Sequence, residues 1–232
     1  PTLHPARKDA ESNRACGSPG ERQPHQGRQQ GTDAPDDSTG GTWGDVFKIE
    51  DAFRGTREEI RRRLRENLDL IRRAGAGSST HPILDIGCGR GEDTATLLAA
   101  GLRVVAFDLS PEALMHARLR APAATVTCAS VLAPFPLEGE GIGVVVASLS
   151  LHYFPWPVTL SLAERIRGTL APGGVLLCRL NSAEDHHFGA TGHPEIEPGY
   201  FLVDGEPKRF FDRAAVDALF GAPWRTLAVE HR

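Results

Sequence analysis

The residues with the clearest chemical meaning form the run Leu84-Asp85-Ile86-Gly87-Cys88-Gly89-Arg90-Gly91. Its glycines would let a ligand approach the backbone closely, because no Cβ stands in the way. The spacing is neither the dinucleotide pattern G-x-G-x-x-G nor the Walker pattern that ends in lysine. Asp85 would repel a pyrophosphate but attract a ligand that carries an ammonium and a sulfonium group. Asp108, seventeen residues after Gly91, is suited to accept hydrogen bonds from a ribose diol.

A second group of chemically capable residues follows a later apolar run. His152 and Tyr153 are the candidate catalytic residues, because a histidine that titrates near neutral pH can act as a general base. His152 could equally cap the loop or line a pocket, and the residues alone leave both roles open. Arg179 and Asn181 end the next apolar run and are candidate substrate contacts at the same rim.

A long polar segment, about 182–211, is predicted to be a lid loop over the acceptor, with Tyr200 and Arg209 as candidate contacts. Its histidines are His186, His187 and His193. Their spacing is a weak metal-ligand pattern and is more typical of solvent-exposed loop residues, so no metal site is predicted.

The elements that position these residues alternate between strand and helix. Strands are predicted over 83–86, 104–107, 125–128, 142–149 and 175–180, and a last strand over Trp224–Glu230. The segment Pro111–Leu119 is predicted to be a helix, and a helical stripe through Val158, Leu162 and Ile166 ends at Pro172-Gly173-Gly174. This alternation predicts an α/β fold with a doubly wound, mostly parallel sheet.

Residues before this pattern fall into two parts. The segment 1–42 contains no Val, Ile, Met, Phe, Trp or Tyr, so a disordered tail is predicted. The segment 43–77 is predicted to be a helical cover, with a capping box at Thr56 and Glu59 and an apolar stripe at helical spacing. Its outer face would carry the pairs Glu58–Arg62 and Glu59–Arg63. The remaining residues, 78–232, would form the main domain.

The composition excludes several classes of protein. The 232 residues carry a net charge of −4, whereas a general nucleic-acid binder needs a basic excess. No stretch approaches the roughly 20 apolar residues that span a bilayer. The four cysteines show no CxxC pairing. A cytoplasmic enzyme is therefore expected, as a monomer or homodimer, with no membrane or nucleic-acid partner.

Residues 83–181 resemble the class I S-adenosylmethionine (SAM)-dependent methyltransferases. The glycine segment resembles their SAM signature, and Val104–Asp108, Pro134-Phe135-Pro136, Ala147–Tyr153 and Leu170–Gly174 resemble later motifs in the same order. The resemblance implies a Rossmann-like fold, SAM as cofactor and S-adenosylhomocysteine as product. The cofactor-binding residues that it implies are Asp85, Gly87, Cys88, Gly89, Gly91, Asp108, Leu109, Ser130 and Ser148.

The sequence departs from the family pattern at three places. Ser130 stands where an acid often contacts adenine, and Gly143 stands where an acid usually opens the fourth strand. The family usually ends in a hairpin of two strands, but only Trp224–Glu230 has a strand pattern here.

Two further resemblances bear on the acceptor and disagree. Ser148–Phe154, Arg179–Ser182 and Lys208–Phe211 resemble a small bacterial branch near the tellurite-resistance and thiopurine-type methyltransferases, which implies a small acceptor. The short segment Phe53–Ile60 resembles O-antigen chain-terminating methyltransferases, which implies a sugar or phosphate acceptor. We favour a small molecule. A non-catalytic SAM-binding scaffold remains an alternative, while an RNA methyltransferase is disfavoured because no Asn/Asp-Pro-Pro-Tyr/Phe motif follows the fourth strand.

Overall fold

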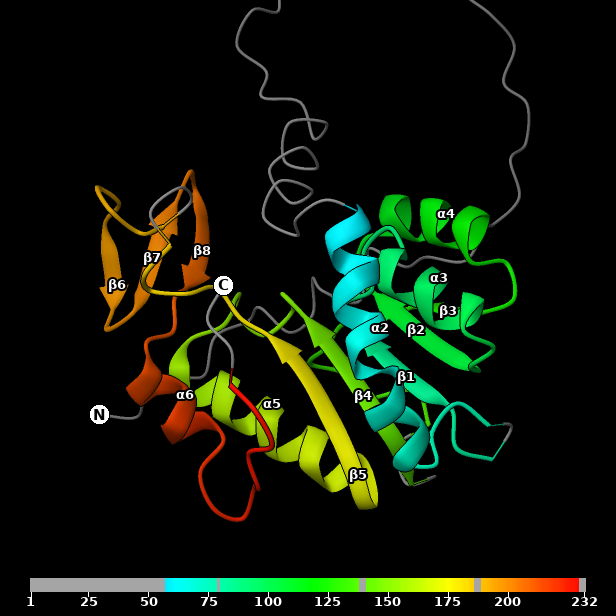
Figure 1. Cartoon of the computed structure of the whole chain (residues 1–232). Coiled ribbons are helices and arrows are strands. Elements are labelled where there is room, and N and C mark those ends of the chain that lie inside the picture. Colours follow the sequence, from blue (N-terminus) through cyan, green and yellow to red (C-terminus); the bar gives the residue numbers. More distant parts are fainter. Residues whose placement is uncertain (1–56, 79, 138–140, 186–188, 230–232) are drawn as a thin grey trace, which may run out of the picture.

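The computed structural model describes residues 57–78, 80–137, 141–185 and 189–229 (Figure 1). The predicted tail 1–42, the capping residue Thr56 and the histidines His186 and His187 lie outside this part. Its elements in chain order are α2 (Arg57–Arg73), β1 (Ile83–Ile86), α3 (Glu92–Ala99), β2 (Val104–Asp108), α4 (Pro111–Arg120), β3 (Thr125–Cys128), β4 (Ile142–Ser148), α5 (Trp156–Thr169), β5 (Leu170–Arg179), β6 (Glu195–Glu197), β7 (Tyr200–Val203), β8 (Glu206–Arg209) and α6 (Arg213–Leu219).

The main sheet has five parallel strands in the order β3-β2-β1-β4-β5. Figure 1 shows α2, α3 and α4 on one side of it and α5 and α6 on the other. The predicted doubly wound α/β fold is confirmed. The strand order reverses direction between β1 and β4, and ligands of such sheets bind beyond the carboxyl ends of the strands at this point.

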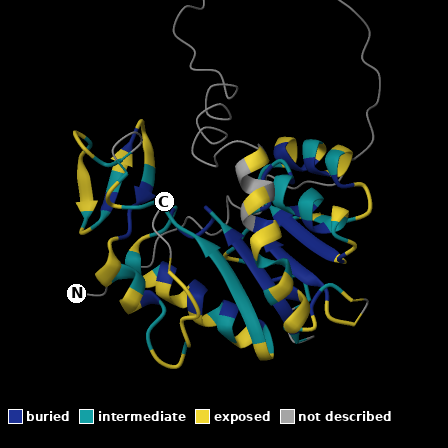
Figure 2. Cartoon of the chain, viewed as in Figure 1, coloured by how far each residue is buried: buried dark blue, intermediate teal, exposed yellow. Residues whose placement is uncertain are grey.

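The burial of the strands explains why they form the centre of the fold. Every residue of β1 and all but the last of β4 are buried, as expected for strands that helices cover on both faces. The strand β3 alternates between exposed and half-buried residues because it lies at the edge of the sheet (Figure 2). No helix in the described ranges is both long and apolar enough to cross a bilayer.

The helix α2 covers one face of the sheet as predicted, but its surface ion pairs differ. Leu64 and Ile71 are buried in the core that this face shares with α3 and α4. Arg62 pairs with Glu66 at 2.7 Å and Arg65 with Glu58 at 3.6 Å, instead of the predicted Glu58–Arg62 pair. The side chains of the predicted Glu59–Arg63 pair lie outside the described part.

The strand β5 begins at Leu170, five residues earlier than predicted, because the Pro-Gly-Gly segment continues the strand through an irregularity rather than ending it. The register with β4 shifts between Ile142 and Val144. A Cβ on Gly174 would lie 2.9–3.1 Å from the carbonyl oxygens of Ala171, Ile142 and Gly143. Glycine is therefore required where the two backbones approach each other.

The predicted polar lid segment contains a second sheet. Its three antiparallel strands have the order β6-β7-β8, and it stands apart from the main sheet (Figure 1). A two-residue turn joins β7 to β8, with φ of 51° at Asp204 and 85° at Gly205. Positive φ at both positions is the signature of a type I′ hairpin turn. We call residues 195–209 the accessory sheet.

The predicted strand at Trp224–Glu230 is wrong over its described residues, 224–229, which adopt no regular structure. Trp224 packs against the core between the main sheet and α5. Its ring meets the ring of Phe220 edge-on, with centroids 5.6 Å apart. Leu227 and Val229, the apolar residues that suggested a strand, are exposed.

The packing of α3 on α4 gives a test of the fold. Gly91 has a φ of +77°, and an added Cβ would lie 3.0 Å from the Cα and Cβ of Ala117. Gly101 has a φ of +79° with nothing within 4 Å. Gly101→Ala should cost about 1 kcal/mol of unfolding free energy through the left-handed backbone alone. Gly91→Ala should cost at least about 1 kcal/mol more through overpacking. Urea unfolding measures both, and equal losses would contradict the packing.

Candidate functional site

The glycine loop joins β1 to α3 and is tied to the end of β2. The backbone N–H groups of Gly87 and Cys88 both donate to the carbonyl of Phe107, at 2.9 and 3.0 Å. The N–H of Gly91 donates to the carbonyl of Cys88 at 2.9 Å, which closes the turn. Gly87, Gly89 and Gly91 all have positive φ, from 53° to 77°. Glycine is needed at these positions because other residues rarely adopt this conformation.

Asp108 braces the same loop from the end of β2. Its carboxylate accepts from the N–H of Gly89 at 2.8 Å and from the N–H of Ser110 at 2.9 Å. The two carboxylate oxygens together offer about four acceptor positions. Asp108 is half-buried, so its remaining acceptor capacity can serve a ligand at the rim. The predicted ribose contact fits this geometry, together with a bracing role that the sequence did not indicate.

Asp85 is buried in β1 and is tied to α3. It is 1% exposed and accepts a hydrogen bond of 2.5 Å from the hydroxyl of Thr94, a buried residue of α3. This bond links the end of β1 to the helix that follows the glycine loop. A buried carboxylate still favours a cationic ligand nearby, because the low dielectric of the interior weakens screening. Sequence reasoning missed Thr94.

The end of β4 packs directly on the glycine loop. A Cβ on Gly87 would lie 2.7 Å from the Cβ of Ser150, which is 7% exposed. Leu149, between β4 and Ser150, has a φ of +52°. Left-handed backbone at a non-glycine residue is costly, and such strain is frequent at functional sites. The sequence did not single out either residue.

His152 and Tyr153 come together just beyond this contact. Their ring centroids are 4.0 Å apart, and His152 is 4% exposed. The carbonyl of His152 accepts from the backbone N–H of Arg209 at 2.7 Å. The structure therefore brings the predicted catalytic residues to the carboxyl end of β4, with the imidazole buried.

Tyr200 and Arg209, predicted as substrate contacts, are both buried and have intramolecular partners. The Tyr200 hydroxyl donates to the carbonyl of Tyr153 at 2.8 Å, and burial raises the pKa of this phenol above its usual value. The Arg209 guanidinium donates to the carbonyls of Phe154 and Pro198 and to the carboxylate of Glu197. Each of its three nitrogens thus donates at least one hydrogen bond within the fold.

The other predicted site residues lie at the carboxyl ends of the strands. Ser148, the last residue of β4, is the register partner of Arg179, the last residue of β5. The amide nitrogen of the Asn181 side chain donates to the carbonyl of Arg209 at 3.4 Å. Arg179 and Asn181 are therefore brought to one rim with Ser148.

The predicted adenine side lies at the ends of β2 and β3. Leu109 follows Asp108 and is exposed, which suits a flat apolar contact. The hydroxyl of Ser130 accepts from the N–H of Leu132 at 3.2 Å and so shapes the loop after β3. Gly143 has a packing reason, because an added Cβ would lie 3.0 Å from the Cβ of Ala76. Glycine in place of the family's usual acid at position 143 is therefore explained by the close packing of Ala76, in the segment after α2, on β4.

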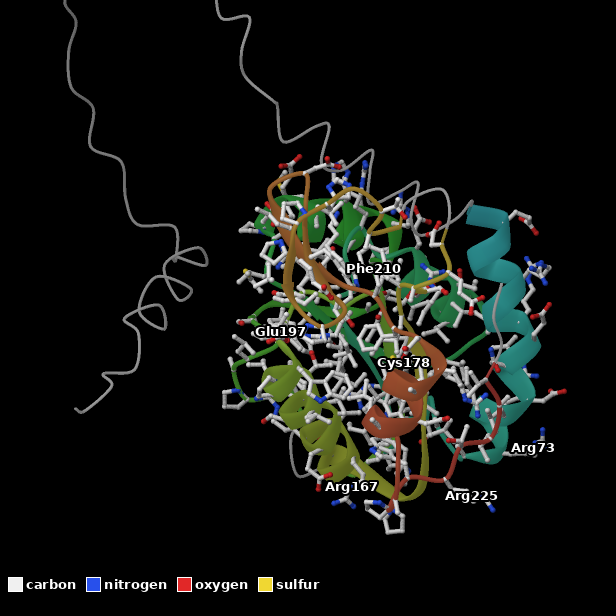
Figure 3. The ribbon with its side chains drawn as sticks, turned by 90° about the vertical axis from the view of Figure 1, so that its left-hand side faces the viewer. Arg73, Arg167, Cys178, Glu197, Phe210 and Arg225 are labelled. Atoms are coloured by element: carbon white, nitrogen blue, oxygen red, sulfur yellow. The ribbon has the colours of Figure 1, made fainter. Side chains whose placement is uncertain are left out.

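Two cysteines near the site carry free thiols. Cys88 is buried within the glycine loop. Cys178 is in β5 and packs against the core beside α5; Figure 3 shows it near α6. Burial raises the pKa of the Cys178 thiol to about 12. Cys178 is therefore a neutral packing residue near neutral pH and not a nucleophile.

Comparison with known proteins finds methyltransferases among the relatives of this chain. Residues 83–174 match the family described as Methyltransferase domain. A relative from Paracidovorax citrulli, named trans-aconitate 2-methyltransferase, is 35% identical over 129 residues, covering 54% of this chain and 48% of that protein. An uncharacterized methyltransferase from Synechocystis is 36% identical over 94 residues, covering 40% of this chain and 43% of that protein. The chain thus spans about half the length of the curated relatives it matches.

Solved structures agree at the level of the fold. A SAM-dependent methyltransferase from Clostridium acetobutylicum aligns with a TM-score of 0.57 at 14% identity, covering 76% of this chain and 85% of that chain. The DesVI protein of Streptomyces venezuelae aligns with a TM-score of 0.55 at 21% identity, covering 77% and 88%. The fold is therefore Rossmann-like, and residues 83–174 within it match a methyltransferase domain.

The thiol of the half-buried Cys178 predicts a loss of stability at alkaline pH. Its pKa is about 12 in the folded protein against 9.0 for a free thiol. Between these values the folded state keeps a proton that the unfolded state has lost, so stability is full below pH 9.0 and falls as the pH rises. The unfolding free energy of the wild type should fall more steeply from about pH 9 to pH 11 than that of Cys178→Ser.

The contribution of Tyr200 must be separated from that of Cys178. The pKa of Tyr200 is also raised, so its ionisation likewise lowers the unfolding free energy at alkaline pH. Tyr200→Phe is therefore the matched comparison, and the Cys178→Ser difference should persist in that background. Parallel pH profiles of wild type and Cys178→Ser would contradict the burial of the thiol.

Proposed function

We propose that this protein transfers a methyl group from SAM to a small-molecule acceptor. The observation that carries the proposal is the glycine loop, which is fixed to the end of β2 by Phe107 and lies beside the carboxylate of Asp108. This loop is at the reversal point of a parallel sheet, where such folds bind their ligands. The matched methyltransferase segment contains the whole loop.

The chemistry asks the protein mainly for alignment and exclusion of water. SAM, when bound, supplies the methyl group that the acceptor attacks in line. The glycine loop and Asp108 would hold the cofactor, and the buried carboxylate of Asp85 would favour its positive charge. A buried site near His152 would keep water away from the reacting atoms.

A proton acceptor is needed only when the acceptor molecule must lose a proton. His152 is the titratable residue that follows β4, and it lies against Tyr153. We infer that His152 takes this proton, with Tyr153 fixing the plane of its ring. The segment 182–211, which includes the accessory sheet, would form one wall of the acceptor site. Arg179 and Asn181 would contact the acceptor from the end of β5.

A small acceptor is favoured over a glycan. The relative from Paracidovorax citrulli is named for the methylation of trans-aconitate, a small tricarboxylate. The proposed kinship with the tellurite-resistance and thiopurine-type branch also points to a small acceptor. Carboxylates and thiols are therefore the first acceptors to test.

A non-catalytic SAM-binding subunit is the second candidate. Within the described residues the main sheet ends at β5, and the accessory sheet does not extend it. An open strand edge can pair with a strand of another chain. Turnover distinguishes this candidate from the enzyme.

Turnover is tested by incubating the protein with methyl-labelled SAM and a panel of small carboxylates, including trans-aconitate, and small thiols. We expect S-adenosylhomocysteine to form together with a labelled product for at least one acceptor. The control is the same reaction without acceptor. Binding of SAM with no labelled product from any acceptor or partner chain would favour the scaffold.

Asp108 tests the placement of the cofactor. Asp108→Ala removes a charge-assisted acceptor and should cost on the order of 2–4 kcal/mol of SAM affinity, measured by calorimetry. Asp108→Asn keeps one acceptor oxygen and should lose less. Glu112→Ala removes an exposed acid in the first turn of α4 and is the matched control. Unchanged affinity in Asp108→Ala would show that the ribose lies elsewhere.

His152 tests the proton transfer. His152→Gln keeps hydrogen-bonding capacity but cannot act as a base near neutral pH. We expect turnover to fall by about 10²-fold or more, with SAM affinity unchanged. Full turnover of the variant with an acceptor that must lose a proton would exclude the base role.

A further inference from the structure

We propose that Glu197, Tyr200 and Arg209 are positioning residues that hold the segment 152–156, and with it His152, at the acceptor side of the site. This inference rests on the proposed function for its catalytic meaning, whereas its structural content can be tested independently. The accessory sheet supplies all three residues. Figure 3 shows Glu197 beside the end of α5 and Phe210 between the accessory sheet and the main domain.

Arg209 is the centre of this arrangement. It is 3% exposed, and its guanidinium pairs with the Glu197 carboxylate. It also donates to the carbonyl of Phe154 at 3.2 Å, while its backbone N–H donates to the carbonyl of His152 at 2.7 Å. The guanidinium lies 5.3 Å from the ring centroid of Trp156, within cation–π range. One residue thus contacts three positions of the segment.

Glu197 caps the helix that follows the segment. The N-cap of α5 is Pro155, which has no side-chain group to accept a hydrogen bond. The carboxylate of Glu197 accepts from the N–H of Trp156 at 2.7 Å and takes this role from 41 residues away. A negative charge at a helix N-terminus is also favoured by the helix dipole.

Tyr200 completes the set from the neighbouring strand. Its hydroxyl donates to the carbonyl of Tyr153, and its ring lies 5.0 Å from the Arg209 guanidinium. Tyr200 and Arg209 are register partners across β7 and β8, so both side chains point to the same face of the accessory sheet. The carbonyls of His152, Tyr153 and Phe154 each accept a hydrogen bond from Tyr200 or Arg209, and the N–H of Trp156 donates one to Glu197.

These contacts are separate from those that hold the glycine loop. The loop is held by Phe107 and Asp108 at the end of β2, whereas the accessory sheet bonds to the segment after β4. Loss of the Glu197–Arg209 pair should therefore disturb His152 and leave the cofactor side intact. A residue that merely stabilised the whole domain would affect both.

The experiment measures the exposure of His152 without any acceptor. Histidine rings are labelled at Cε1, and the His152 resonance is identified by its absence in His152→Gln. Relaxation caused by a soluble gadolinium chelate reports the solvent accessibility of each ring. The affinity for S-adenosylhomocysteine is measured in parallel by calorimetry. The variants are Arg209→Ala, Arg209→Lys and Tyr200→Phe, with Arg213→Ala as control, because Arg213 pairs with Asp217 on the exposed surface of α6.

We expect the His152 ring to be protected in the wild type and in Arg213→Ala. In Arg209→Ala its relaxation should rise toward that of the exposed His81, with a smaller rise in Arg209→Lys and Tyr200→Phe. The ring of His116, in α4, should not change. Affinity for S-adenosylhomocysteine should stay within about twofold of the wild type, because the two sets of contacts share no residue.

Two results would overturn the proposal: an unchanged His152 ring in the folded variants, or an equal rise at His116. If Arg209→Ala does not fold, the exposure of the His152 ring in Arg209→Lys and Tyr200→Phe tests the proposal instead. Failure of the wild type to bind S-adenosylhomocysteine would count against the proposed function, while the response of His152 would still decide the positioning role.

Discussion

The carbonyl of Phe107 and the carboxylate of Asp108 hold the glycine loop, and the site depends on this contact. Three N–H groups of the loop, at Gly87, Cys88 and Gly89, donate to these two residues. Left unsatisfied, such groups would cost about 1–3 kcal/mol each, so the loop conformation and the register of β1 against β2 stabilise each other. The left-handed glycines follow from this geometry, because the chain must turn sharply beside a second strand.

The proposed site draws on two parts of the fold. The cofactor side comes from the ends of β1 and β2, where Thr94 satisfies Asp85 and backbone N–H groups satisfy Asp108. The proposed acceptor side comes from the segment after β4, to which Arg209 of the accessory sheet donates hydrogen bonds. The charged groups of Asp85, Asp108 and Arg209 each have a hydrogen-bond partner within the fold, as buried charges require.

The sequence was a good guide wherever short-range pattern decides structure. Buried apolar runs such as 83–86 predict strands directly, and the glycine spacing predicts the loop. The sequence was a poorer guide to structure that depends on contacts between residues far apart in the chain. Tyr200 and Arg209 were predicted to lie in a lid loop, but they are buried in the accessory sheet and bond to a segment about 50 residues earlier.

One missed element did carry a local signal. Asp204-Gly205 is a hairpin dipeptide that follows the strand-like residues Tyr200–Val203, and it could have revealed β7 and β8. Trp224–Val229 shows the opposite error, since its apolar pattern suggested a strand but Trp224 packs in the core.

The central claim, that the glycine loop binds SAM, is tested most directly by calorimetric titration of the purified protein with SAM and with S-adenosylhomocysteine. The account predicts one site that binds both in the micromolar range, and binding of neither would contradict it.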